Sequence, residues 1–307
     1  MATRGAEQWS GTRASRFIGI AAGWCVAGAA WAQCTEGWLP GTGWPAPPTG
    51  LAWWDPDGAG PRPEVLVAAG GPQRASGLSR ERVVTWDGVQ WRALGGEFTA
   101  AGLPEAPVGA VIFDGELIVL GGFDAVGGEP AGRVARWDGT RWVSLGPAPS
   151  DWTRVSTMGA HNGRLYAAGT VGATRVVREW TGSAWRTIGA FDGSAAVTRV
   201  LSFRGELVVA GSFAGIEGVA ADSVVAWDGA RWRSLGVDFV RTSGGMVRDA
   251  AVFNDQLVVA GVLLGSTGTG TIRAAARYDG QAWLPLGDVG VTEAWGVGVV
   301  GDELWLS

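Results

Sequence analysis

The residues that could carry catalysis or bind a metal are few in this sequence. It contains one histidine, His161, and two cysteines, Cys25 and Cys34, in 307 residues. Ordinary zinc and copper sites need several histidine or cysteine ligands, and Ser-His-Asp or Cys-His catalysis would have to use His161. Because His161 directly precedes Asn162-Gly163, a pair typical of turns, we interpret it as a strand-end residue. The sequence predicts neither a metal site nor a cofactor.

Acidic residues are the other candidates for chemistry. A glycosidase uses two carboxyl groups, separated by roughly 5–10 Å, as acid and base or as acid and nucleophile. The acidic residues between the repeats described below are Asp151, Asp192, Asp238, Asp249 and Glu293. The sequence does not show which of these residues lie close together in the fold. Acidic residues in loops are commonly just solvated. The segment Asp55-Pro56-Asp57-Gly58 resembles the start of a calcium loop but lacks a closing carboxylate, so we interpret it as part of an extended turn.

A motif built around tryptophan dominates the rest of the sequence. The segment RVARWDGTRWVSLG at residues 133–146 recurs with changes in the segments that start at Val83, Val176, Ser223 and Ala274. In each copy two aromatic residues flank a four-residue turn, which predicts a β-hairpin with the aromatic side chains facing each other. Such a pair fixes the strand register. Because Thr181 replaces the aspartate in one copy, we interpret this aspartate as a turn residue and not as a catalytic group.

A second hairpin lies between successive tryptophan motifs. It consists of two apolar runs separated by a two-residue turn, as in VGAVIFDGELIVLGGF at residues 108–123. A divergent copy with a longer turn occupies residues 51–71. Turns such as Asp114-Gly115 favour the positive φ angles of a type I′ hairpin. The apolar runs are nearly continuous, which predicts strands covered on both faces.

The two hairpins alternate and together make four-stranded units. The first aromatic residues of the tryptophan motifs are separated by 51, 43, 47 and 51 residues, and they are Trp86, Trp137, Trp180, Trp227 and Tyr278. Four-stranded antiparallel units that repeat every 40–50 residues or so predict an all-β fold, the β-propeller. A β-sandwich would give no reason for the two kinds of hairpin to alternate in this fixed order.

We place five blades at roughly residues 51–96, 108–147, 155–190, 197–237 and 247–288, and a partial sixth blade at residues 292–307. The segment Gly37-Trp38-Leu39-Pro40 resembles Ala282-Trp283-Leu284-Pro285. We therefore predict that residues 35–41 add an N-terminal strand to the incomplete last blade, which would protect its edge. The alternative is that this chain is a truncated module of a larger cell-surface protein.

The repeats resemble those of known propeller families. The glycines that end the second strand of each unit resemble Kelch repeats, and they are Gly121-Gly122, Gly169, Gly211 and Gly261. The Trp-Asp-Gly-x-x-Trp-x-x-Leu-Gly units resemble secreted bacterial propellers related to the galactose-oxidase central domain and to Rax2-like domains. The resemblance implies the fold and is nearly silent on activity. Galactose-oxidase chemistry needs copper ligands and a Tyr-Cys crosslink, whereas the only tyrosines, Tyr166 and Tyr278, occupy repeat positions.

The N-terminus has the features of a signal peptide. Arg4, Arg13 and Arg16 precede an uncharged run that ends in Ala30-Trp31-Ala32, a small-x-small cleavage signal. Cleavage of residues 1–32 would remove three arginines and one glutamate, so the formal net charge would change from −5 to −7. Cys34 would remain as the single cysteine, and no internal disulfide could form. A retained N-terminal anchor is the alternative.

Charge and composition restrict the partners. An acidic chain without basic clusters gives no reason to expect a nucleic acid or an anionic membrane surface as partner. We expect no membrane insertion after signal cleavage. We predict an exported, monomeric and non-enzymatic β-propeller, residues 33–307, that binds a protein or glycan through its loops. The alternative is a glycan-acting hydrolase or lyase that uses loop carboxylates.

Overall fold

The computed structural model describes residues 48–307 except for 59, 74–80, 147–150, 237–245, 268–269, 288 and 301. The predicted signal peptide (1–32) and the predicted closing strand (35–41) lie outside the described residues, as do Cys34 and Asp238. All regular secondary structure in the described part is β-strand. A search of the same residues finds no helix with the length and apolar character needed to cross a membrane.

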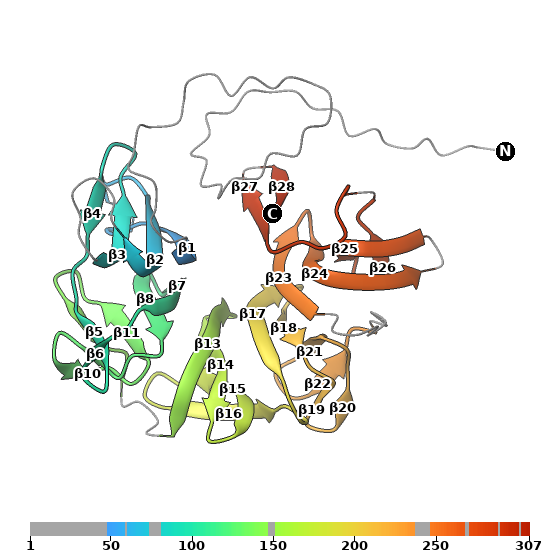
Figure 1. Ribbon diagram of the computed structural model, residues 1–307, viewed down its shortest axis with the longest axis horizontal. Helices are drawn as coiled ribbons and strands as arrows, with labels where there is room; N and C mark the ends of the chain where they lie inside the picture. Colours follow the sequence, from blue (N-terminus) through green and yellow to red (C-terminus); the bar gives the residue numbers. More distant parts are fainter. Residues whose placement is uncertain are drawn as a thin grey trace.

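The strands form a succession of antiparallel blades (Figure 1). Blade 1 contains β1 (Pro48–Trp54), β2 (Val65–Gln73), β3 (Glu81–Trp86) and β4 (Trp91–Ala93). Blade 2 contains β7 (Pro107–Phe113), β8 (Glu116–Gly121), β11 (Val134–Trp137) and β12 (Trp142–Ser144). Blade 3 contains β13 (Trp152–His161), β14 (Arg164–Val171), β15 (Thr174–Trp180) and β16 (Trp185–Ala190).

Blade 4 contains β17 (Ala196–Phe203), β18 (Glu206–Ser212), β21 (Val224–Trp227) and β22 (Trp232–Ser234). Blade 5 contains β23 (Met246–Phe253), β24 (Gln256–Thr267), β25 (Gly270–Tyr278) and β26 (Trp283–Pro285). A two-stranded sixth blade contains β27 (Val297–Val300) and β28 (Glu303–Leu306). These sheets confirm the predicted all-β propeller of four-stranded antiparallel blades, and the described residues supply two strands of the last blade.

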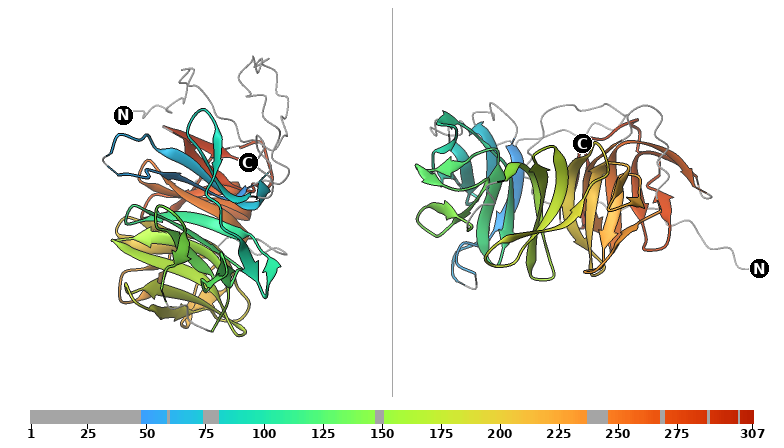
Figure 2. Two further views of the ribbon diagram at one scale, coloured as in Figure 1. Left: turned by 90° about the vertical axis from the view of Figure 1, so that its left-hand side faces the viewer. Right: turned by 90° about the horizontal axis from the view of Figure 1, so that it is seen from below.

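The first strand of each blade is its innermost strand, and these strands lie around the centre of the ring (Figure 1). Side views show the strands running between two faces of the molecule (Figure 2). We call the face on which the innermost strands begin the connection face, because the chain passes there from one blade to the next. We call the opposite face the turn face, because turns such as Asp114-Gly115 and Asn162-Gly163 lie there.

Apolar side chains on both faces of the second strands hold the blades together, as the sequence predicted. In β8, the consecutive residues Leu117, Ile118 and Val119 are all 0% exposed. Successive side chains of a strand point to opposite faces, so β8 contacts both neighbouring blades. Leu117 and Val119 belong to the core cluster shared with blade 1, and Ile118 belongs to the cluster shared with blade 3.

The tryptophan hairpins have the predicted register. The two aromatic residues of each motif face each other, with ring centroids 5.1 to 5.4 Å apart, in the pairs Trp86–Trp91, Trp137–Trp142, Trp180–Trp185, Trp227–Trp232 and Tyr278–Trp283. The aspartate between them is a turn residue. Oδ1 of Asp138 accepts hydrogen bonds from the N–H groups of Arg141 (2.8 Å) and Thr140 (2.9 Å), and these bonds lower the pKa of Asp138 to about 2.

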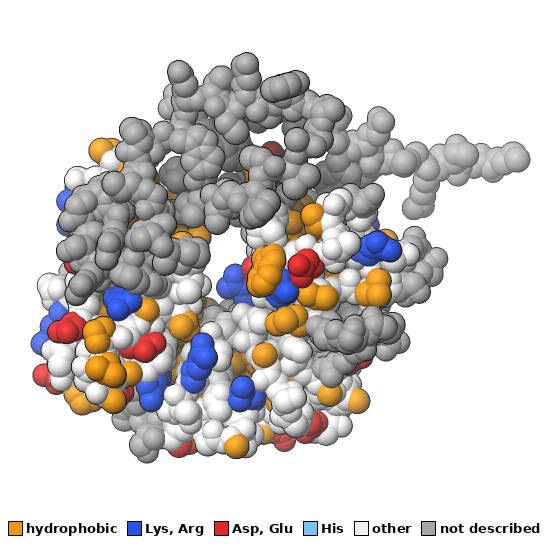
Figure 3. Space-filling model, in the orientation of Figure 1, with side chains coloured by type: hydrophobic (Ala, Val, Ile, Leu, Met, Phe, Trp, Pro, Cys, Tyr) orange, Lys and Arg blue, Asp and Glu red, His pale blue; other side chains and the backbone are white. Residues whose placement is uncertain are grey.

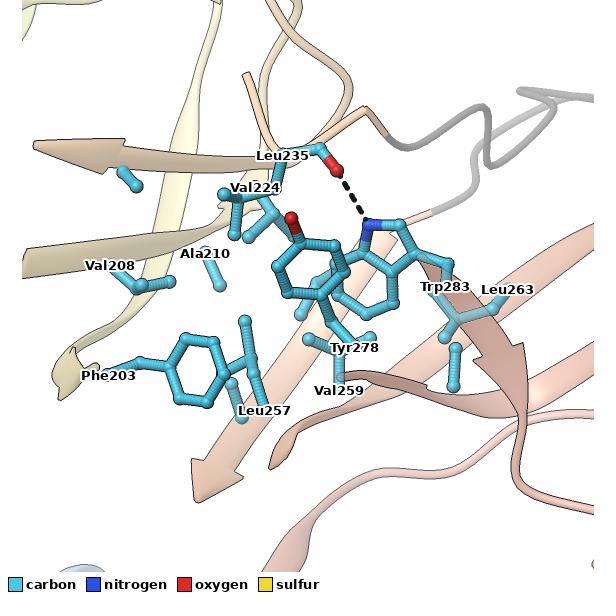
Figure 4. Close-up of a cluster of buried hydrophobic side chains, with 14 of the residues drawn as sticks. Phe203, Val208, Ala210, Val224, Leu235, Leu257, Val259, Leu263, Tyr278 and Trp283 are labelled. Carbon is cyan, nitrogen blue, oxygen red and sulfur yellow. Dashed lines mark hydrogen bonds between the residues drawn. The ribbon is translucent and has the colours of Figure 1, made fainter. Parts of the chain in front are cut away.

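The second tryptophan of the motif also joins neighbouring blades, which the sequence did not reveal. The indole N–H of Trp283 in blade 5 donates a hydrogen bond to the carbonyl oxygen of Leu235 in blade 4, at 3.0 Å (Figure 4). Equivalent bonds link Trp142 to Gly95 (3.1 Å) and Trp232 to Ile188 (2.9 Å). The Leu-Gly end of the motif is therefore the docking position for the tryptophan of the next blade.

Blades 2 and 4 carry additional short strands near the connection face. They form one four-stranded sheet and one two-stranded sheet, made of β5 (Phe98–Ala100), β6 (Leu103–Pro104), β9 (Ala125–Val126) and β10 (Glu129–Pro130), and of β19 (Gly215–Ile216) and β20 (Val219–Ala220). A phenylalanine in each insertion packs on one from the preceding connection: Phe123 lies 5.0 Å from Phe98, and Phe213 lies 4.8 Å from Phe191. These insertions fasten blade 2 to blade 1 and blade 4 to blade 3.

Candidate functional site

The candidate carboxylates lie on the connection face, where each innermost strand begins. Four of the five fall within the described residues: Asp151, Asp192, Asp249 and Glu293. Their partners decide whether they can act as acids and bases or whether they hold the blades in place.

Asp151 fixes the start of blade 3. Its carboxylate accepts two hydrogen bonds from Arg178 of β15, from Nη1 to Oδ1 at 2.9 Å and from Nη2 to Oδ2 at 2.6 Å. These bonds lower the pKa of Asp151. The Arg178 guanidinium also lies over the ring of Trp152, 4.8 Å from its centroid. Asp151 is therefore held as an anion, whereas a general acid must be held protonated.

Asp192 and Asp249 make contacts between successive blades. Oδ2 of Asp192 accepts a hydrogen bond from the N–H of Gly218 at 3.2 Å and so fastens the additional hairpin of blade 4 to the connection from blade 3. Asp249 of blade 5 accepts a hydrogen bond from Nε of Arg199 in blade 4. Its Oδ2 also accepts one from the N–H of Val297 in blade 6, at 3.0 Å. Asp249 therefore ties three blades together.

Glu293 belongs to an aromatic platform at the start of the sixth blade. Nη2 of Arg248 donates a hydrogen bond to Oε2 of Glu293 at 3.2 Å. The Arg248 guanidinium carbon lies 3.4 Å from the ring centroid of Trp295, whose side chain is 68% exposed. The cation over the ring restrains the indole. We call Arg248, Glu293 and Trp295 the Trp295 platform.

One donor atom of Arg248 has no partner. Its Nη1 atom is buried and has no hydrogen-bond partner among the described residues. Leaving a buried donor unpaired is costly, and such groups need a physical explanation. Glu293 and the ring of Trp295 therefore satisfy the Arg248 guanidinium only in part.

Other arginines accompany Arg248 on the innermost strands. Arg154 is on β13 and Arg199 is on β17, both near the connection face. Basic side chains gather along the edge of the central opening in Figure 3. Arg199 pairs with Asp249, whereas Arg154 is exposed and has no ion pair within the described part of the chain. This edge therefore presents hydrogen-bond donors to a polar or anionic ligand.

His161 has a structural environment. It ends β13 beside the Asn162-Gly163 turn, as expected, and it is 6% exposed. Its Nδ1 lies 2.8 Å from the hydroxyl of Ser202 in blade 4. Burial lowers the pKa of His161, which favours the neutral imidazole at pH 7.

The described carboxylates thus act as links between structural elements. Each of the four accepts a hydrogen bond from an arginine or from a backbone N–H group of a neighbouring element. Among the described residues, no three His, Cys, Asp or Glu side chains are grouped in a way that could hold a metal ion. Asp238 lies outside the described residues.

The sequence did not reveal Arg248 or Trp295 as site residues. One signal was present: Trp295 lies outside both repeated hairpins, so the repeat does not explain it. Arg248 carried no comparable signal, because its role depends on the connection that brings Glu293 and Trp295 beside it.

Comparisons with known proteins concern the fold alone. No family model matches the chain, and no curated protein matches it. One similar solved structure is the extracellular domain of a hybrid two-component system from B. thetaiotaomicron, with a TM-score of 0.47 and 11% identity over 83% of this chain and 36% of that chain. Another is a chain of the mitotic checkpoint complex, with a TM-score of 0.46 and 17% identity over 80% of this chain and 67% of that one. Because this chain spans little more than a third of the bacterial protein's length and both scores are below 0.5, the propeller assignment depends on the strand pairing described above.

Proposed function

We propose that this protein is an exported, non-enzymatic binding module that takes a protein or glycan ligand on its connection face. The observation that carries the proposal is the Trp295 platform, an indole that is 68% exposed and yet held by a guanidinium 3.4 Å from its centroid. Tryptophan and arginine are the residues most often found at the energetic centres of binding surfaces.

The chemistry around the platform supports binding and gives catalysis no support. The Arg248 guanidinium lies against the aromatic ring, and Arg154 is exposed near the start of another innermost strand, β13. The neighbouring carboxylates Asp249 and Glu293 are engaged by Arg199 and Arg248. A ligand can therefore stack on the indole and accept hydrogen bonds at its rim.

Export is supported by the sequence. The uncharged run at residues 17–32 and its Ala30-Trp31-Ala32 end have the form of a cleavable signal. The resemblance of the repeats to Kelch-type and Rax2-like secreted propellers agrees with this location. We propose that residues 1–32 are removed and that residues 33–307 are the propeller.

The test is a binding screen against surface glycans and envelope proteins, followed by substitution of the platform. We expect Trp295→Ala to weaken binding of the ligand found by about 30-fold or more, because hot-spot residues contribute at least about 2 kcal/mol. The matched control is Trp53→Ala, since Trp53 is 58% exposed at the turn-face end of β1. Equal binding by both variants would contradict the site. Robust hydrolase turnover that disappears on substitution of one acidic loop residue would contradict the non-enzymatic function.

A further inference from the structure

A groove opens on the turn face between blades 2 and 3. It has a volume of about 760 Å³ and is lined by Phe113, Asp114 and Glu116 of blade 2 and by Gly163, Trp180 and Thr181 of blade 3. The groove lies on the face opposite the Trp295 platform, so it is independent of the proposed function.

The repeat shows what occupies the same space between blades 4 and 5. Phe113 and Asp114 correspond to Phe203 and Arg204, because both pairs end an innermost strand and enter its turn. On the facing blades, Gly163 corresponds to Asp255 as the second residue of the turn. Thr181 corresponds to Asp279, since each follows the first aromatic residue of a tryptophan motif.

The Arg204 side chain bridges blades 4 and 5. Its Nε and Nη2 donate hydrogen bonds to Oδ2 of Asp255, at 3.1 and 2.7 Å. Its Nη1 donates to the carbonyl oxygen of Asp279. The guanidinium carbon also lies 5.3 Å from the ring centroid of Phe203. Blade 4 therefore supplies its own guanidinium to this junction.

The corresponding arginine is missing between blades 2 and 3, while most of its surroundings remain. Asp114 stands in the position of Arg204, and Gly163 stands in the position of Asp255. Phe113 and Thr181 still line the space. Between blades 4 and 5, the carboxylate is that of Asp255 on the facing blade. Between blades 2 and 3, the carboxylate is that of Asp114, at the position equivalent to Arg204.

The charged residues of the groove leave one carboxylate without a partner. The basic residues that line it are Arg136 and Arg164, and both are already paired: Nη1 of Arg136 lies 2.6 Å from Oε1 of Glu116, and Arg164 pairs with Glu179. Asp114 has no hydrogen-bond or ion-pair partner in the described part of the chain. Glu179 is shared between Arg164 and Arg186, so Asp114 is an unpaired carboxylate that faces the groove beside a cluster of two arginines and one glutamate.

We propose that the groove between blades 2 and 3 binds a guanidinium group, namely the arginine side chain of a peptide or protein partner. Asp114 would take the role of Asp255, the carbonyl oxygen of Thr181 that of the Asp279 carbonyl, and Phe113 that of Phe203. A lysine ammonium is a point charge and lacks the planar fork that can bond to a carboxylate and a carbonyl at once. The site therefore discriminates arginine from lysine.

The backbone allows the two junctions to be exchanged by substitution. Asp114 and Arg204 have similar positive φ angles, 52° and 46°. Asp255 likewise has a positive φ of 56°, close to the 68° of Gly163. The double variant Asp114→Arg/Gly163→Asp should therefore rebuild the bridge of blades 4 and 5 within the groove. The reverse variant Arg204→Asp/Asp255→Gly should open the equivalent space.

Isothermal titration calorimetry of the full chain with a short capped peptide that contains one arginine tests the proposal. We expect one peptide per chain, and binding at least about tenfold weaker for the lysine and citrulline versions of the same peptide, about 1.4 kcal/mol. The variant Asp114→Arg/Gly163→Asp should lose binding while its thermal unfolding stays cooperative. The reverse variant should bind two peptides per chain.

Several outcomes would overturn the guanidinium site. They are the absence of binding to the wild-type chain, equal affinity for the lysine or citrulline peptide, and undiminished binding to a folded Asp114→Arg/Gly163→Asp variant. The proposed function would survive each of them, because Trp295→Ala alters the opposite face. Conversely, a Trp295 platform that binds no ligand would not change the result of the calorimetric titration with the arginine peptide.

Discussion

The junction between blades 2 and 3 and the junction between blades 4 and 5 are built from the same repeat positions, yet one is open and the other is filled. Arg204 crosses the second junction to Asp255, whereas Asp114 leaves a groove in the first. The comparison teaches that a groove can open between two blades where one unit departs from the repeat pattern. The filled junction shows what the groove lacks, which is an arginine at the position of Arg204.

The same two junctions also differ in how the tryptophan motif joins the blades. At the filled junction, the indole N–H of Trp283 reaches the carbonyl oxygen of Leu235. In blade 3 the corresponding Trp185 instead makes an edge contact with Trp152, with the ring centroids 6.3 Å apart. It is Trp180 that approaches Gly146 at the end of blade 2. The arrangement of these indoles accompanies the opening of the groove.

The largest effect should come from breaking the link at the filled junction. Trp283 is 7% exposed and packs in the core cluster between blades 4 and 5, so Trp283→Ala should lower the free energy of unfolding by about 3–5 kcal/mol. Trp185→Ala should cost clearly less, because Trp185 is only partly buried. Urea unfolding of the two variants under the same conditions measures the difference. Equal losses would show that both junctions depend on the second tryptophan to the same degree.

An intermediate effect should come from Glu179, which distinguishes blade 3 electrostatically. Its side chain is 2% exposed and pairs with Arg164 and Arg186, whereas the equivalent contact in blade 5 is a hydrogen bond from Arg277 to the neutral Gln256 at 3.0 Å. Glu179→Gln should cost about 1–3 kcal/mol at neutral pH, since it removes hydrogen bonds to a buried charged group. The comparison variant in blade 5 is Arg277→Leu, which removes the hydrogen bond to the neutral Gln256.

The cost of Glu179→Gln should depend on pH. Burial alone would raise the pKa of Glu179, but the hydrogen bonds and charges of Arg186 and Arg164 outweigh it and hold this pKa below its ordinary value of 4.5. A depressed pKa stabilises the fold above the unfolded-state value and loses that contribution as the pH falls through the folded-state value. The stability difference between wild type and variant should therefore be full above about pH 5.5 and shrink below about pH 4.5. A difference that stays constant down to pH 3 would contradict the ion-pair explanation.

The smallest effect should come from the turns of the tryptophan motifs. In blade 5, Oδ1 of Asp279 accepts hydrogen bonds from the N–H groups of Ala282 and Gln281, both at 2.8 Å, and these bonds lower its pKa. In blade 3, the hydroxyl oxygen of Thr181 accepts a single such bond from Ala184 at 3.1 Å. We expect Asp279→Ala to lower the melting temperature slightly and Thr181→Asp to raise it slightly. Differential scanning calorimetry measures both, and opposite signs of these shifts would contradict the turn role.

Local structure was predictable from the sequence to a large extent. The Asp-Gly turns and the five-residue aromatic spacing predicted the pairing of Trp137 with Trp142, and the alternation of two hairpins predicted the blades. The candidate site was not predictable. Asp151, Asp249 and Glu293 were candidates because of their positions, but their arginine partners come from other strands or blades. The closing strand at residues 35–41 remains a prediction.

The sequence by itself determined the hairpins, since turn chemistry and cross-strand packing act between residues close in the chain. Only the tertiary structure decided which side chains meet between blades. Arg204 reaches Asp279 across 75 residues, and Arg248 meets Glu293 and Trp295 across more than 40. Such contacts depend on how each blade is turned against the next, and no local periodicity encodes that orientation. The folded ring therefore decided that Trp295 is held against a cation and that Asp114 faces an open groove.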